Sequence, residues 1–281
     1  MDIAVIAVPY DAGRRSIGVG LGPARLLESG LAIKLRAAGH TVRDTTVEMP
    51  DYAPAHELAR VTALQRELGG MVRMAIAGGE FPVVLAGNCS TAVGTLAAAP
   101  AGTAVIWFDA HADFNTAETT TTGMLDGLAL SMITGRALRN LTTGVEGFVP
   151  IREDHVVLVG ARNLDPPEEK ALSASRITRV AADAASASLG ATLRALSPLV
   201  RQVYVHLDLD VLDPARARAN RYAAPGGLSP SELVTALTAI ADVATVYALA
   251  VTAYDPVWDR DGATQHAAVD AILAVVAPPD R

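Results

Sequence analysis

The stretch that decides the fold reads Trp107-Phe108-Asp109-Ala110-His111-Ala112-Asp113-Phe114-Asn115, and a later stretch of the same character reads His206-Leu207-Asp208-Leu209-Asp210-Val211-Leu212-Asp213-Pro214. Each follows an apolar run, 104–108 or 203–207, of the kind typical of a buried strand. Side chains alternate between faces in an extended chain, so Asp109, His111 and Asp113 are expected to point one way. By the same alternation Asp208 and Asp210 share a face, and the two strand ends present their charged groups together.

These charged side chains need cations among them if the two strand ends meet. Four aspartates and one histidine converge, and carboxylates taken out of water repel one another unless cations lie among them. One Asp-x-Asp alone is better explained by capping aspartates at a strand end, but two such stretches, one with His111 at its centre, favour a metal pair. Oxygen ligands with a single imidazole suit Mn(II) or Mg(II) better than zinc. We expect manganese.

Composition limits the classes of function. The chain has 281 residues, 51% hydrophobic, and a formal net charge of -7 without any cluster of Lys and Arg. This argues against binding to nucleic acid or to a membrane surface, and favours small-molecule partners. A single cysteine, Cys89, excludes an intramolecular disulfide framework, and the first residues show neither a basic signal region nor an apolar run of spanning length. A cytoplasmic enzyme is the expectation.

Strands and helices alternate along the chain. The sequence predicts buried strands at 3–8, 83–85, 104–108, 155–159, 203–207 and 247–252, and a further short strand near 41–44. Helices are predicted from Pro23 towards Ala38, over 55–77 with a possible break at Gly69-Gly70, from near Thr91, over 128–133, 181–196 and 266–276, and after the capping box that begins at Ser229. The pattern indicates a single domain, residues 1–281, with a parallel sheet covered on both faces.

Two polar loops stand out in this arrangement. The glycine-rich segment 17–22 has Pro23 where a dinucleotide fingerprint would need glycine, and we interpret it as a mobile loop. The threonine-rich segment 116–127 follows the first acidic stretch, so a functional role is favoured over that of a solvated surface turn. Because ligands of parallel sheets bind at the carboxyl ends of the strands, we expect the site there.

Taken together, the motifs resemble the ureohydrolase family, that is arginase, agmatinase and their relatives. The resemblance covers nearly the whole chain, and the D-A-H-x-D motif combined with D-x-D-x-x-D-P is highly specific; it runs through Gly22-Pro23, Gly87-Asn88, 109–113, 162–168, 208–214 and Asp255-Pro256. It implies a three-layer α/β/α sandwich around a mostly parallel eight-stranded sheet. It further implies two Mn(II) ions per chain, hydrolysis of a guanidino or amidino carbon, and a homo-oligomer, either trimer or hexamer.

The resemblance also implies individual roles. Asp109, Asp113 and Asp208 correspond to ligands that bridge or share the two ions, and His111 and Asp210 complete one site. Asp113 is similar to the residue that orients the attacking hydroxide and passes its proton to the leaving amine. Asp213 is interpreted as a structural turn residue with Pro214.

Three departures from the family pattern lie at the head-group end of the substrate. Cys89 stands where the family usually has a histidine ligand, so it either coordinates metal as a thiolate or leaves one site weakened. Asp126 stands where arginase has its proton-shuttling histidine, and Ala253 where it has the glutamate that holds the guanidinium.

The opposite end of the substrate site matches the family. Asn115 and Thr122 correspond to positions with which arginase binds an α-carboxylate, and Asp165 to its contact with the α-amino group. This match favours a guanidino amino acid over agmatine, which lacks the carboxylate.

A less basic head group explains the departures best. Hydroxylation lowers the basicity of a guanidinium, which then needs neither a full anionic clamp nor a strong general acid, and Cys89 is similar to the N-hydroxyarginine hydrolase branch of the family. The hypothesis is hydrolysis of Nω-hydroxy-L-arginine to ornithine and hydroxyurea. An ordinary arginase, an agmatinase, a formimidoyl-type hydrolase and a metal-binding but catalytically silent arginase-like protein remain as alternatives.

Overall fold

A single eight-stranded sheet forms the centre of the molecule. The structure, a computed structural model, describes residues 1–51, 55–196, 200 and 202–277. The strands lie in the order β4-β1-β5-β10-β9-β6-β7-β8, and all their pairings are parallel. Their bounds are β1 Asp2–Val8, β4 Thr41–Thr46, β5 Phe81–Ala86, β6 Thr103–Phe108, β7 Val156–Val159, β8 Thr178–Val180, β9 Gln202–Asp208 and β10 Thr245–Thr252. A small antiparallel hairpin, β2 Tyr10–Asp11 with β3 Arg14–Arg15, follows β1.

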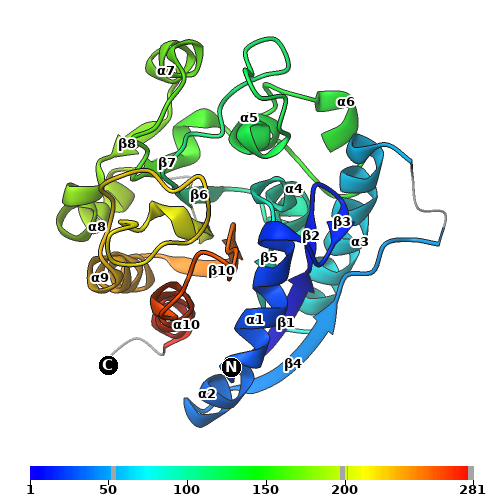
Figure 1. Ribbon diagram of the computed structural model, residues 1–281, viewed down its shortest axis with the longest axis vertical. Coiled ribbons are helices and arrows are strands. Elements are labelled where there is room, and N and C mark those ends of the chain that lie inside the picture. The colour runs from blue at the N-terminus through cyan, green and yellow to red at the C-terminus, as the bar shows by residue number, and fades with distance from the viewer. Residues whose placement is uncertain (52–54, 197–199, 201, 278–281) are drawn as a thin grey trace.

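Helices cover both faces of this sheet (Figure 1). The bounds are α1 Gly22–Glu28, α2 Leu31–Ala37, α3 Glu57–Ala77, α4 Ala92–Thr95, α5 Ala129–Ile133, α6 Arg139–Thr142, α7 Pro166–Ser173, α8 Ala185–Ala195, α9 Pro230–Ala241 and α10 Ala263–Val276. One apolar core joins the sheet to α1, α2, α8, α9 and α10, and a second joins its other face to α3, α4 and α5. The predicted three-layer α/β/α sandwich is confirmed.

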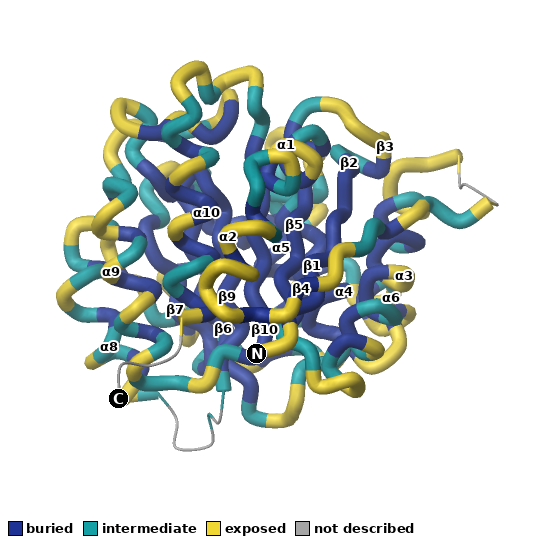
Figure 2. The backbone as a smooth tube through the Cα atoms, turned by 90° about the horizontal axis from the view of Figure 1, so that it is seen from below, coloured by how far each residue is buried: buried dark blue, intermediate teal, exposed yellow. Residues whose placement is uncertain are grey.

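The alternation of side chains in the strands explains the two cores. In β1, Ile3 and Val5 belong to the first core, whereas Ala4, Ile6 and Val8 belong to the second. Both faces are apolar because both are covered, which is why the strands read as continuous apolar runs rather than as alternating ones. Figure 2 shows the resulting buried centre inside a more exposed shell of helices and loops.

Several predicted boundaries differ from the structure. The helix expected from Pro23 to Ala38 is two helices, because Gly30 adopts a left-handed conformation with φ of 81° between α1 and α2. The possible break at Gly69-Gly70 is absent, and α3 continues through it. The glycine-rich segment interpreted as a mobile loop forms a short 3-10 turn at Gly18–Leu21 directly before α1. The capping box at Ser229 is confirmed at the start of α9.

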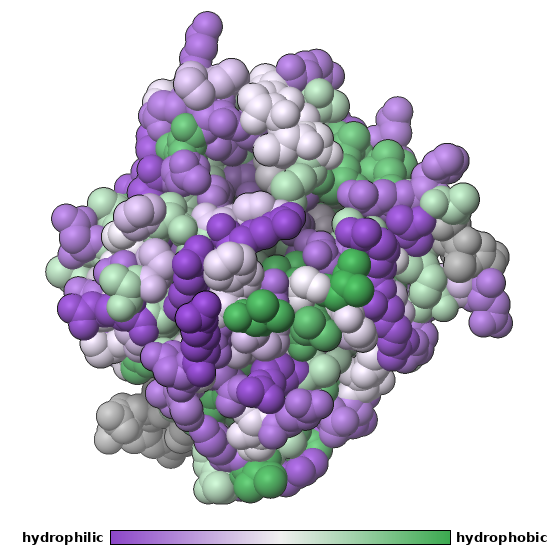
Figure 3. Space-filling view, viewed as in Figure 1, coloured by the Kyte–Doolittle hydropathy of each residue, from purple (hydrophilic) through white to green (hydrophobic). Residues whose placement is uncertain are grey.

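Within the described residues, no helix has the combination of length and apolarity needed to cross a bilayer. On the face in Figure 3, hydrophobic side chains gather in small groups among hydrophilic ones.

Candidate metal centre

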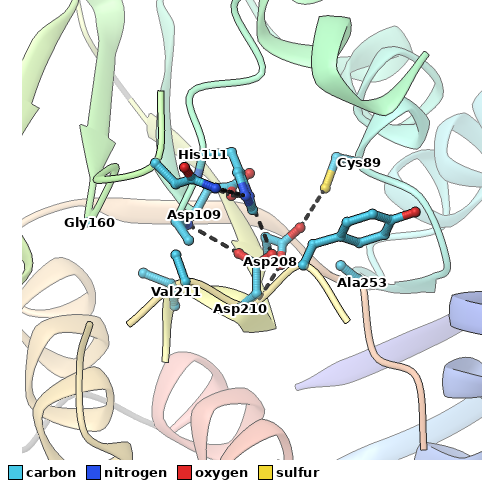
Figure 4. Close-up of polar contacts among 12 residues, drawn as sticks. Cys89, Asp109, His111, Gly160, Asp208, Asp210, Val211 and Ala253 are labelled. Carbon is cyan, nitrogen blue, oxygen red and sulfur yellow. Dashed lines mark hydrogen bonds and ion pairs between the residues drawn. The ribbon is translucent and has the colours of Figure 1, made fainter. Parts of the chain in front are cut away.

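The two acidic stretches meet because their strands are neighbours. β6 and β9 pair in parallel with Trp107 opposite His206 and Phe108 opposite Leu207, so both chains leave the sheet at the same edge. Asp109 follows β6 directly, and Asp208 is the last residue of β9. Figure 4 shows His111, Asp109, Asp208 and Asp210 gathered at this edge, with Cys89 reaching towards them from the turn after β5.

One group of possible ligands consists of Asp109, His111 and Asp210, whose ligand atoms all lie within 4.8 Å of one another. His111 Nδ1 lies 3.3 Å from Asp109 Oδ1 and 3.4 Å from Asp210 Oδ2. The ring therefore presents Nδ1, and not Nε2, to the position that a metal ion would take.

A second group consists of Cys89, Asp109 and Asp113, again within 4.8 Å, and Asp208 lies against it. The Cys89 thiol donates a hydrogen bond to Asp208 Oδ2 at 3.0 Å. Asp109 belongs to both groups and is placed to bridge two ions. All five predicted Asp and His ligands thus converge, together with Cys89.

The reason for this convergence differs from the predicted one. The stretches were expected to stay extended, so that alternation would align the side chains, but the chain turns after both strands. Asp113 has a left-handed backbone with φ of 51°, and a 3-10 turn spans Leu209–Val211. Each turn is closed by a carboxylate that accepts a backbone N–H: Asp109 Oδ1 from His111 at 2.7 Å and Asp208 Oδ1 from Asp210 at 2.8 Å.

The electrostatics of the site call for a cation. Burial and the neighbouring carboxylates raise the pKa of Asp109, and they raise the pKa of Asp113 and Asp208 far above the ordinary value. Burial acts to lower the pKa of His111, but its contacts with Asp109 and Asp210 outweigh this and bring the pKa to about 12. Burial likewise acts to raise the pKa of Asp210, and the His111 contact outweighs it, giving a pKa of about 2. A positive charge placed among these carboxylates would offset their mutual repulsion.

The residues present fit a pair of hard divalent ions. Asp113 Oδ2 is buried and has no hydrogen-bond partner among the described residues, a costly state that a metal–oxygen bond would relieve. Four carboxylates and one imidazole form the oxygen-rich donor set that manganese and magnesium prefer. Cys89 is the weak member, since burial and then Asp208 raise its thiol pKa well above the ordinary value and favour the protonated form.

A cavity of about 440 Å³ is lined by five of the expected ligands, Cys89, His111, Asp113, Asp208 and Asp210, and its wall includes the predicted substrate residues Asn115, Thr122 and Asp165. Asn115 Nδ2 lies 3.4 Å from Asp165 Oδ2, and Thr121 donates to the same oxygen at 3.3 Å. Thr122 Oγ1 accepts the N–H of Met124 at 3.2 Å. The structure therefore gathers the three predicted tail-binding residues on one side of the cavity.

Asp126 lies beside Cys89 rather than free in the cavity. Its carboxylate accepts Asn88 Nδ2 at 2.5 Å and the Ser90 N–H at 3.1 Å, which ties the threonine-rich loop to the turn after β5. Burial raises its pKa to about 7, against the opposing effect of these two hydrogen bonds. A carboxyl group in this state is able to gain and lose a proton near neutral pH.

Sequence interpretation missed Asn220, a fully buried residue that lines the cavity. Its side-chain amide donates to Ala253 O at 2.9 Å and lies 3.4 Å from Asp210 Oδ2. Ala253 itself has a left-handed backbone, with φ of 60°. These two residues form an uncharged part of the wall beside the metal ligands. No local pattern marks Asn220 as a cavity residue, because its bond to Ala253 joins positions 33 residues apart.

Comparisons with known proteins agree with this geometry. The sequence model of a family described as the arginase family matches residues 1–277. The arginase of Bacillus subtilis (strain 168) is 31% identical over 293 residues, covering 98% of this chain and 97% of its own, and the arginase of Bacillus caldovelox is 30% identical, covering 95% of each. The crystal structure of arginase from Bacillus cereus superposes with a TM-score of 0.89 at 29% identity, covering 99% of both chains.

Proposed function

This chain belongs to the arginase family, and we propose that it is a manganese-dependent amidinohydrolase whose substrate is Nω-hydroxy-L-arginine or a closely similar modified arginine. At the level of the family, it is a hydrolase that acts on guanidino C–N bonds. The proposal adds the metal, the substrate and the roles of individual residues.

Asp109, His111, Asp113, Asp208 and Asp210 would hold the ions. When bound, manganese supplies a Lewis acid that makes water nucleophilic near neutral pH. The oxygen of this water bonds to the guanidino carbon, and the bond from that carbon to the side-chain nitrogen breaks. The leaving nitrogen gains a proton, and the products are ornithine and hydroxyurea.

The protein groups around the reacting carbon position the substrate and move protons. In this proposal Asp113 orients the attacking water, takes its proton and passes it to the leaving nitrogen, and the acid form of Asp126 supplies the second proton of the product ammonium group. Asn115, Thr122 and Asp165 bind the α-carboxylate and the α-amino group at the far side of the cavity. Because these contacts hold the amino-acid end, the guanidino carbon is directed towards the metal ligands.

The observation that carries the substrate proposal is the uncharged wall formed by Ala253 and Asn220. A guanidinium gains most from a carboxylate beside it, and hydrogen bonds to charged groups are worth about 1.5–3 kcal/mol. Without that carboxylate, a cationic head group loses more binding free energy than a hydroxylated one. The lower basicity of the hydroxylated group leaves it closer to neutral.

A substrate panel tests this proposal. With Mn(II), kcat/KM for Nω-hydroxy-L-arginine should exceed that for L-arginine by about 10–100-fold. This ratio corresponds to the free energy of the absent hydrogen bond between a carboxylate and the guanidinium. Agmatine should be poor because it lacks the carboxylate. Equal turnover of arginine would contradict the assigned specificity and favour an ordinary arginase, whereas preference for agmatine or a formimidoyl substrate would favour those alternatives. Bound Mn(II) without turnover of any guanidine or amidine would favour the silent alternative.

Asp126 is proposed to act as the general acid in place of the usual histidine. Because its acid form is populated below a pKa of about 7, kcat should fall as pH rises through that value. The Asp126→Asn variant should lose about 100-fold in kcat and lack this limb of the pH profile. Stopped assays of urea or hydroxyurea from pH 5.5 to 9 measure both. An unchanged limb in the variant would assign the titration to another group.

A further inference from the structure

The turn after β7 forms hydrogen bonds to the segment that carries the first ligand group, Asp109, His111 and Asp210. The backbone N–H groups of Arg162 and Asn163 both donate to Ala110 O, at 2.8 and 3.0 Å. Ala110 lies between Asp109 and His111, so these bonds fix the turn that carries two of the three ligands. The side chains of Arg162 and Asn163 also contact residues of this group.

The Arg162 side chain holds the third ligand through its backbone. The guanidinium donates to Asp210 O at 3.0 Å and to Leu212 O at 3.2 Å, on either side of Val211, whose carbonyl lies 3.3 Å away. It also reaches the carbonyl groups of Gly160, Ala224 and Pro225. One planar group thus ties three segments of chain together beneath Asp210.

Two glycines make room for this arrangement. A Cβ atom at Gly227, where φ is 111°, would come within 2.7 Å of Arg162 Nη2, and one at Gly160, where φ is 90°, would come within 2.6 Å of Val211 Cγ2. Figure 4 shows Gly160 and Val211 beside the ligand cluster. The backbone at Gly160 and Gly227 can therefore approach Val211 and Arg162 this closely because neither glycine has a side chain.

The Asn163 side chain completes the support by facing the His111 ring. Asn163 Nδ2 lies 3.3 Å from His111 Nε2. A 180° turn of the amide group places Oδ1 there instead, and Oδ1 is able to accept the Nε2–H. His111 Nδ1 faces Asp109 and Asp210. A histidine that binds a metal through one nitrogen commonly donates its other N–H to a neighbour, which fixes the ring and its tautomer.

We infer that Arg162 and Asn163 are positioning residues that build the Asp109–His111–Asp210 metal site, Arg162 by holding the backbone of Asp210 and Asn163 by holding the ring of His111. The inference rests on the manganese centre of the proposed function and extends it to two residues outside the expected ligand set. It also makes the two metal sites unequal, because His111 and Asp210, which Asn163 and Arg162 hold, belong to the first group and not to the Cys89 group.

Asn163 offers the cleaner test, because its side chain is exposed and its loss should not affect folding. Mn(II) affinity is measured by calorimetry on the full chain. Asn163→Ala should weaken the tighter site by about 10–100-fold, whereas Asn163→Asp, whose carboxylate accepts the same N–H, should bind at least as tightly as the wild type. Asn140→Ala, an exposed asparagine on α6, is the matched control and should bind as the wild type does.

A second measurement reports on the histidine directly. In the Co(II)-loaded protein, the NMR resonance of the His111 Nε2–H is shifted away from the other signals by the metal, and Asn163 should protect this proton from exchange with water. Its exchange should accelerate in Asn163→Ala and return towards the wild-type rate in Asn163→Asp. A role in folding alone would not produce this pattern.

Arg162→Lys tests the other half, since it keeps the charge but loses the planar fork. It should weaken the tighter site by about 10-fold. Arg152→Lys, at an exposed arginine that pairs with Asp154, serves as its control. Wild-type affinity in both Asn163→Ala and Arg162→Lys would overturn the inference while leaving the manganese centre intact. A wild-type protein that binds no Mn(II) would overturn both.

Discussion

Asp109→Asn is expected to abolish tight Mn(II) binding at both sites and to lower kcat/KM by about 1000-fold or more. Among the residues that the structure describes, Asp109 is the one that belongs to both ligand groups, so its charge would serve both ions. A bound metal ion contributes several kcal/mol to transition-state stabilisation, and each 1.36 kcal/mol corresponds to a factor of ten in rate. Metal analysis after Mn(II) loading and gel filtration should find less than one ion per chain in this variant.

The control for this variant is Asp213→Asn, in the other acidic stretch. Asp213 accepts the Ala215 N–H at 3.1 Å, consistent with a structural turn role, and an asparagine is able to accept the same bond. It should retain metal and activity. Thermal unfolding without metal separates misfolding from ligand loss: removing one of several repelling carboxylates should leave the melting temperature of Asp109→Asn no lower than that of the wild type. Retention of two tightly bound ions in Asp109→Asn would contradict the bridging role.

Ala253→Glu is expected to reverse the substrate preference. A carboxylate at this wall would face the head group, so kcat/KM for L-arginine should rise by about 10–100-fold relative to that for the N-hydroxy analogue. Ala253→Gln is the matched control because it has the same size and suffers the same strain at a φ of 60°, but it carries no charge. Parallel assays with both substrates measure the ratio.

The two variants separate charge from shape. If Gln changes the ratio as much as Glu does, the volume of the side chain at residue 253 decides specificity, and the electrostatic explanation is wrong. If neither variant changes the ratio, the wall formed by Ala253 and Asn220 does not contact the head group at all.

The sheet could be predicted from sequence where its strands are long apolar runs. β6 and β9 are buried on both faces and read as continuous apolar stretches. The alternation of such stretches with helices indicated that the sheet is parallel. β8 was missed because it is three residues long and includes the exposed Arg179. The helix α7 was missed because Pro166–Ser173 begins within a polar cluster, although Asp165 and Glu168 form a capping box there.

The ligand set could be predicted because acidic residues at strand ends carry a strong local signal. Their geometry could not, since the left-handed turn at Asp113 and the 3-10 turn after Asp208 depend on hydrogen bonds formed only in the folded chain. Asn220 was out of reach for the same reason. Its amide bonds to Ala253, 33 residues away, and Arg162 holds segments 48 to 63 residues away.

We propose that two neighbouring strand ends hold two divalent ions in one shared cluster. Diffraction at the manganese absorption edge from crystals grown with Mn(II) tests it most directly. Two anomalous peaks are expected beside the cavity, both within bonding distance of Asp109, with the peak beside His111 at the higher occupancy. Peaks elsewhere, or none while the protein is fully folded, would contradict it.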